Sequence, residues 1–124
     1  MSDRSILVVD DDAAMRQMLV EQLRDHGYDA RAVPGVEPAL ESLARDSFHA
    51  VLCDVQMTSR DGFELLEEAT RRGVPAPVVL MSAFSTPEME RRALAEGAFA
   101  FLSKPFGERE LLDVLARVPR SGET

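Results

Sequence analysis

Residues suited to metal and phosphate chemistry stand directly after four short apolar runs of this chain. The first run ends on Asp10 and Asp11, and later runs end on Asp54, Ser82 and Lys104. If these runs are parallel strands of one sheet, their carboxyl ends meet at one edge, where open α/β sheets bind ligands. That edge would hold clustered carboxylates, a hydroxyl and an ammonium group, a set suited to a divalent cation and a phosphoryl group.

The acidic members of this set predict metal-assisted chemistry at a carboxylate. Neighbouring carboxylates repel one another unless a cation joins them, and oxygen ligands of this kind favour a hard ion such as Mg²⁺. Asp54, alone at the end of its run, could be a nucleophile that forms an aspartyl-phosphate. The metal, the Ser82 hydroxyl and Lys104, the only lysine among fourteen basic residues, would then neutralise the incoming phosphoryl oxygens.

The overall composition limits the classes of protein and partner. A length of 124 residues fits a single domain spanning 1–124. A net charge of −8 argues against a nucleic-acid or anionic-membrane surface, since both need basic patches. One cysteine forms no internal disulfide, and no apolar run approaches the roughly 18 residues of a membrane span. We therefore expect a cytoplasmic protein.

Short apolar runs alternate with amphipathic stretches five times along the chain. The strands are expected at Ile6–Val9, Asp29–Val33, Ala50–Cys53, Val78–Met81 and Phe99–Ser103. The helices are expected at Ala13–His26, from about Pro38 to Asp46, from about Phe63 to Gly73, from Ser85 to Gly97, and at Glu108–Val118. A core of about 5–118 remains, followed by a polar tail at 119–124.

Several polar residues are expected to cap these helices rather than to bind a ligand. Asp12 is such a residue at the first helix, and Asp61 at the third. The run that starts at Ser85 fits a capping box, with Ser85 as the cap and Glu88 three residues later. Leu94 is expected on the buried stripe of that fourth helix.

Alternation of this kind predicts an α/β fold with right-handed crossovers and helices on both faces of a parallel sheet. The chain is too short for an eight-fold barrel, so we expect a doubly wound, flavodoxin-like sheet with five strands and five helices. The strand order 2-1-3-4-5 places the half-polar strand Asp29–Val33 at an edge. The switch point then falls between the first and third strands, which carry the acidic residues.

The chain resembles the receiver domains of two-component response regulators over residues 5–118. The resemblance rests on five motifs in order: Val8-Val9-Asp10-Asp11-Asp12, Asp54 with Asp61-Gly62 following, Ser82-Ala83, Gly97-Ala98, and Lys104-Pro105-Phe106. Each motif is weak alone, but all five in this order are highly specific. The resemblance also implies the strand order given above.

The resemblance implies a role for each residue of the site. Asp10, Asp11 and Asp54, with the backbone carbonyl of Gln56, would bind Mg²⁺ as the cofactor. Asp54 would accept a phosphoryl group from a histidine kinase or a phosphotransfer protein. Ser82 and Lys104 would assist that transfer, so the chain would be a phospho-accepting regulator and not an enzyme with a separate substrate.

The resemblance also implies a conformational switch. Ser82 would follow the phosphoryl group, and the aromatic residue of the fifth strand, Phe101, would respond. The face formed by the fourth helix, fifth strand and fifth helix would then bind an effector or a second copy of the chain. Two positions depart from the family pattern: Thr58 stands where proline is common after the loop methionine, and Phe101 where tyrosine is frequent.

Other functions remain open from the residues alone. A Mg²⁺-dependent phosphatase with an Asp nucleophile would need an acid two residues after Asp54, where Gln56 stands. A flavin carrier would need a phosphate cradle after the first strand, where aspartates would repel the phosphate. A degenerate receiver that serves only as a docking module is disfavoured by the complete acidic set. The cognate kinase and the output do not follow from the sequence, although the motifs most resemble receivers that regulate enhancer-dependent transcription factors.

Overall fold

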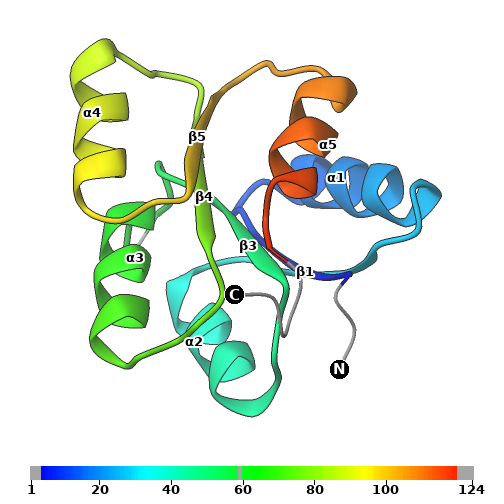
Figure 1. Ribbon diagram of the computed structural model, residues 1–124, viewed down its shortest axis with the longest axis horizontal. Coiled ribbons are helices and arrows are strands. Elements are labelled where there is room, and N and C mark those ends of the chain that lie inside the picture. Colours follow the sequence, from blue (N-terminus) through cyan, green and yellow to red (C-terminus); the bar gives the residue numbers. More distant parts are fainter. Residues whose placement is uncertain (1–3, 59, 120–124) are drawn as a thin grey trace.

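A five-stranded parallel sheet forms the centre of the computed structural model, which describes residues 4–58 and 60–119 (Figure 1). The strands are β1 (Ser5–Val9), β2 (Asp29–Val33), β3 (Ala50–Asp54), β4 (Val78–Ser82) and β5 (Ala100–Ser103). All neighbouring pairs are parallel, in the order β2-β1-β3-β4-β5. The predicted fold class and strand order are confirmed, and every strand end lies within one residue of its predicted position.

Five helices cover the two faces of this sheet. They are α1 (Ala13–Asp25), α2 (Val36–Arg45), α3 (Gly62–Arg71), α4 (Pro87–Ala95) and α5 (Glu108–Ala116). In Figure 1, α1 and α5 lie on one side of the sheet, and α2, α3 and α4 lie on the other. Successive strand residues point to opposite faces, so the core divides into two clusters, one on each side. The alternation of strand and helix thus produces the doubly wound architecture.

The inner strands and the edge strand differ as their sequences predict. Every residue of β1, β3 and β4 is buried, because these strands have helices on both faces. In β2, Ala30 is buried whereas Asp29 and Arg31 are exposed. The predicted edge position of this half-polar strand is therefore confirmed.

Helix caps are confirmed at two positions and wrong at a third. The Asp12 carboxylate accepts the backbone N–H of Ala14, and Asp61 forms a reciprocal capping box with Glu64. The predicted cap at Ser85, with Glu88 as its partner, is wrong.

The cap of α4 is instead the next residue, Thr86, whose Oγ1 accepts the backbone N–H of Met89 at 3.1 Å. Pro87 occupies the first helical position, which proline favours because its missing N–H would have no partner there. The residue directly before the proline therefore becomes the cap. The Ser85 hydroxyl donates to the Ser103 hydroxyl at the end of β5, at 2.8 Å.

Helix α4 is held by few apolar contacts. Among its residues, all of which the structure describes, only Ala93 is buried, and Leu94 is 49% exposed. The prediction that Leu94 belongs to a buried stripe is therefore wrong. A polar contact to α3 replaces part of the apolar packing, because the Arg92 guanidinium lies 3.7 Å from the centre of the Phe63 ring. This helix can shift at a lower cost than one anchored by several large side chains.

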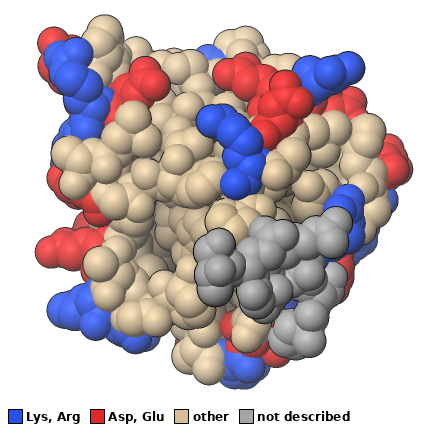
Figure 2. Space-filling view, in the orientation of Figure 1, with Lys and Arg blue, Asp and Glu red and all other residues tan. Residues whose placement is uncertain are grey.

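The charged surface is mixed in sign. On the face shown in Figure 2, lysine and arginine side chains lie among acidic ones and do not form one large basic patch. Within residues 4–58 and 60–119, no helix has the length and apolar character needed to cross a bilayer. Of the predicted polar tail at 119–124, residues 120–124 lie outside the described part of the chain.

Candidate functional site

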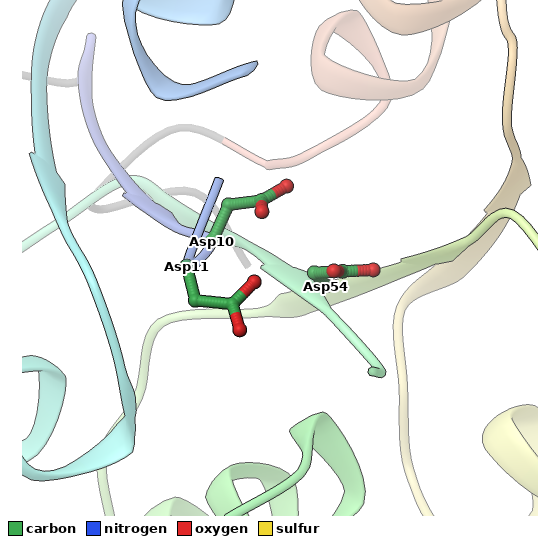
Figure 3. A group of neighbouring side chains, drawn as sticks. All are labelled: Asp10, Asp11 and Asp54. Carbon is green, nitrogen blue, oxygen red and sulfur yellow. The ribbon is translucent and has the colours of Figure 1, made fainter. Parts of the chain in front are cut away.

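Three acidic residues meet at the carboxyl ends of the neighbouring strands β1 and β3 (Figure 3). Asp10 and Asp11 directly follow β1, and Asp54 is the last residue of β3. One oxygen from each carboxylate lies within 4.8 Å of the others. Asp10 and Asp54 are buried whereas Asp11 is exposed, so the group is open to solvent on one side. The structure thus brings together the three residues that the sequence singled out.

Lys104 completes this group from the end of β5. Its Nζ donates to Asp10 Oδ2 at 3.0 Å and lies 3.4 Å from Asp54 Oδ1. The lysine side chain is only 12% exposed, so water screens these ion pairs less than it would at the surface. One ammonium therefore pairs with two carboxylates. Because Asp11 adds a third carboxylate, the cluster keeps an excess of negative charge.

The surroundings of Asp54 disfavour its ionised form. Burial is the largest cause that raises the pKa of Asp54 above its ordinary value, and the negative charge of Asp10 adds to it. Lys104 acts in the opposite direction and lowers that pKa. A further cation beside Asp54 would act in the same direction as Lys104 and favour the ionised carboxylate.

Backbone contacts fix the position from which Asp54 projects. The N–H of Val55 donates to the carbonyl of Met81 at 2.8 Å, which extends the pairing of β3 with β4 by one residue. The N–H of Gly62 donates back to Val55 at 3.0 Å. A Cβ on Gly62 would lie 2.6 Å from the Asp54 carbonyl oxygen, so only glycine lets α3 approach the strand this closely. The Asp61-Gly62 motif thus caps α3 and packs it against the end of β3.

Asp10 is held from the side of α1. Its Oδ1 accepts the backbone N–H of Asp12 at 2.9 Å, and its carbonyl oxygen accepts a hydrogen bond from Arg16 at 2.8 Å. The sequence analysis missed Arg16. Its contact with Asp10 could have been anticipated, because Arg16 is a basic residue one turn into the helix that follows the acidic pair.

Ser82 lies at the end of β4 and makes two hydrogen bonds near the acidic group. Its side chain is fully buried, and its Oγ donates to Oε1 of Gln56 at 2.7 Å. The same Oγ accepts the backbone N–H of Phe84 at 3.0 Å. The sequence predicted a metal-binding role for the Gln56 carbonyl and no acid role for its side chain, but it did not predict this contact with Ser82.

Thr58, one of the two departures from the family pattern, contributes a contact of its own. Its hydroxyl donates to Asp11 Oδ2 at 2.7 Å. The loop after β3 is thereby linked to the exposed carboxylate after β1. The signal in the sequence was a hydroxyl residue four positions after Asp54, but the geometry of the loop decides whether that hydroxyl reaches the acidic group.

Phe101 lies apart from this cluster. It is partly buried on β5, where it pairs in register with Leu80 and packs against the core on the α2–α4 side. It also lines a groove of about 730 Å³ between α4, β5 and α5, together with the exposed Leu94. The predicted switch residue therefore connects the interior to the face predicted to bind partners.

The donor set fits a hard divalent cation. Three carboxylates supply oxygen ligands, and one of them is exposed so that a hydrated ion can enter. Mg²⁺ prefers one or two carboxylates with waters and phosphate oxygens. Asp10, Asp11 and Asp54 would hold such an ion, which would offset the excess negative charge described above.

Replacing Asp11 by asparagine is expected to raise the melting temperature of the metal-free protein slightly and to weaken its response to Mg²⁺. The substitution removes one of the repelling charges, and asparagine keeps an acceptor for the Thr58 hydroxyl. In the wild type, Mg²⁺ should stabilise the folded state by mass action. Thermal unfolding with Mg²⁺ and with a chelator measures both effects.

Asp12→Asn is the matched control, because asparagine caps a helix as well as aspartate does. This variant loses the adjacent charge but should keep the full response to Mg²⁺. A wild-type melting temperature that does not respond to Mg²⁺, or an undiminished response in Asp11→Asn, would contradict the site.

Comparison with known proteins places this geometry in context. The family model for the response regulator receiver domain matches residues 6–116. The response regulator protein FleR of Pseudomonas aeruginosa is 40% identical over 112 residues, which cover 90% of this chain and 24% of that protein. The DNA-binding transcriptional regulator NtrC of Rhizobium meliloti is 34% identical, with 94% and 24% covered. The chain thus spans about a quarter of the length of these two relatives.

Solved structures show the same likeness. The chemotaxis protein CheY4 of Vibrio cholerae superimposes with a TM-score of 0.86 at 30% identity, over 93% of this chain and 98% of that one. The receiver domain of the Francisella response regulator 1452 gives a TM-score of 0.88 at 25% identity, over 93% and 95%. The match extends over nearly the whole chain in both cases.

Proposed function

This chain belongs to the response regulator receiver domain family, and we propose that it is a signalling switch that accepts a phosphoryl group on Asp54. The observation that carries the proposal is the meeting of a buried acceptor, two further carboxylates and a lysine at one sheet edge. The donor is a histidine kinase or a phosphotransfer protein. The chain is a regulator and not an enzyme with a separate substrate.

The transfer uses the residues of the edge in distinct roles. A carboxylate oxygen of Asp54 attacks the phosphorus, and the bond between phosphorus and the donor's histidine nitrogen breaks, leaving the imidazole to take up a proton. Lys104, which lies 3.4 Å from Asp54 Oδ1, neutralises charge on the phosphoryl oxygens. The Ser82 hydroxyl, at the end of the neighbouring strand, donates to another of these oxygens.

Mg²⁺ is the proposed cofactor. The carboxylates of Asp10, Asp11 and Asp54 and the backbone carbonyl of Gln56 would hold it. When bound, the ion offsets the repulsion between the carboxylates and the incoming phosphoryl group. The excess negative charge of the cluster supports this assignment.

The output is a change of the surface formed by α4, β5 and α5. When Ser82 turns toward the phosphoryl group, Phe101 moves inward and α4 shifts, which moves the equilibrium between two states. The light packing of α4 and the groove lined by Phe101 support this surface as the one that changes. Its partner is an effector or a second copy of this chain.

The competing functions fit the site less well. A phosphatase of the Asp-nucleophile type needs an acid at position 56, and Gln56 instead accepts a hydrogen bond from Ser82. A docking module without phosphorylation has no need of the complete acidic set and its lysine. We propose control of a transcriptional regulator as the output, on the likeness to NtrC. We propose the cytoplasm as the compartment, because the single cysteine fits a reducing environment.

Incubation with acetyl phosphate tests the function directly. The intact mass of the wild-type protein should rise by one phosphoryl group in the presence of Mg²⁺ and stay unchanged with a chelator. Absence of any mass increase with Mg²⁺, or an equal increase with the chelator, would contradict the proposal.

The phosphorylated state is expected to decay slowly. Phe84→Glu should accelerate the decay about tenfold, which corresponds to a barrier lower by roughly 1.4 kcal/mol. Phe84 stands two residues after Ser82 and is 72% exposed. Its ring forms no hydrogen bond with a water attacking in line with the Asp54 oxygen, whereas a glutamate there would orient that water. Loss of the phosphoryl mass after removal of the donor measures the rate. Phe84→Leu, which stays apolar, should decay as the wild type does; equal rates in all three proteins would rule out this role.

A further inference from the structure

We infer that the Gln56 side chain is a positioning residue that holds the Ser82 hydroxyl in the resting state and so sets how readily the switch responds. The inference rests on the proposed function and concerns the regulation of the same site. It follows from the hydrogen bond of 2.7 Å between Ser82 Oγ and Gln56 Oε1.

The backbone around Gln56 makes this contact a specific one. Asp54 pairs in register with Met81, and the N–H of Val55 donates to the Met81 carbonyl at 2.8 Å. This extra hydrogen bond keeps the start of the loop beside the end of β4. The backbone of Gln56 is therefore held next to Ser82. Rotation of the Gln56 side chain alone is enough to make or break the hydrogen bond with Ser82.

The hydroxyl of Ser82 can donate one hydrogen bond, and the Gln56 side-chain oxygen accepts it. The remaining contact of that hydroxyl uses its acceptor capacity, because Phe84 donates its backbone N–H to the same Oγ at 3.0 Å. Ser82 must therefore release Gln56 before it can donate to a phosphoryl oxygen. The two hydrogen bonds are mutually exclusive.

Burial makes the release costly. Ser82 is 0% exposed, so water does not readily replace the glutamine oxygen as a partner. The resting state is favoured by this hydrogen bond, and phosphorylation has to offset its loss. A variant without the acceptor leaves the hydroxyl unpaired at rest and brings the protein closer to the responsive state.

The first test uses the protein without metal or phosphoryl group. Three-bond NMR couplings at Ser82 should show one side-chain rotamer in the wild type and an average of rotamers in Gln56→Met, which keeps the length of the side chain but removes the oxygen acceptor. Gln56→Glu keeps an acceptor at the same place and should retain one rotamer. A single unchanged rotamer in Gln56→Met would overturn the inference, whether or not Asp54 is phosphorylated.

The second test measures the affinity for beryllofluoride in the presence of Mg²⁺, as a stand-in for the phosphoryl group. Gln56→Met should bind it about fivefold more tightly than the wild type, the factor that corresponds to one neutral hydrogen bond. Gln17→Met, an equal change at an exposed position of α1, should bind as the wild type does.

A double-mutant cycle shows whether Gln56 acts through Ser82. In the Ser82→Ala background, Gln56→Met should have no effect on the affinity. An equal gain in that background, or a weaker affinity of Gln56→Met alone, would overturn the inference. Failure of the wild type to bind beryllofluoride at all would instead contradict the proposed function, so the two failures are distinguishable.

Discussion

Asp54→Asn is expected to take up no phosphoryl group from acetyl phosphate and Mg²⁺ under conditions that label the wild-type protein fully. An amide oxygen is a poor nucleophile, so asparagine at this position does not form the acyl phosphate that a carboxylate forms. Asp10 is fully buried, and its oxygens already accept from Lys104 and from the backbone of Asp12, so it does not substitute for the acceptor. Intact-mass measurement over time gives the result.

Asp61→Asn is the control for this loss. Position 61 follows the acceptor on the same loop, and asparagine preserves the cap of α3. This variant should be labelled as the wild type is. A melting temperature of Asp54→Asn no lower than that of the wild type excludes unfolding as the cause. Labelling of Asp54→Asn at the wild-type rate would show that another group is the acceptor.

Lys104→Met is expected to lower the free energy of unfolding of the metal-free protein by about 3 kcal/mol. Removal of one partner of a buried ion pair leaves the other charge uncompensated. Here the lysine serves both Asp10 and Asp54, whose side chains are 1% and 10% exposed. The loss should be largest without metal, and Mg²⁺ should recover part of it, because a bound cation relieves the same repulsion.

Chemical denaturation with and without Mg²⁺ measures both parts of this prediction. Arg109→Met removes an exposed cation from α5 and should change stability by less than about 0.5 kcal/mol. If Lys104→Met were as stable as this control without metal, the ion pairs of Lys104 would not hold the cluster together.

The fold could be predicted from the sequence because its signals are strong and repeated. Five short apolar runs alternate with amphipathic stretches, and the half-polar Asp29–Val33 could only be an edge strand. The acidic set was predictable for the same reason, since parallel strands bring their carboxyl ends to one edge of the sheet. The positions of Asp10, Asp54 and Lys104 follow from that rule, whereas the strand order was predicted from the half-polar edge strand of a doubly wound sheet and from the family resemblance.

What the sequence did not predict depends on side-chain rotamers and loop geometry. The contacts of Gln56 with Ser82 and of Thr58 with Asp11 join residues from different elements, and no periodicity encodes them. The cap of α4 is Thr86, one residue later than predicted, because Pro87 favours the first helical position and the cap is the residue before it. The exposure of Leu94 depends on how little of the sheet α4 covers, which only the assembled structure shows.

The measurement that most directly tests the central claim is the location of the phosphoryl group on the wild-type protein. After labelling with acetyl phosphate and Mg²⁺, proteolysis at low pH and mass spectrometry of the peptides assign the modified residue. We predict a single modified peptide, the one that contains Asp54, and no modified peptide when Mg²⁺ is withheld. A phosphoryl group found on any other residue, with Asp54 unmodified, would contradict the account.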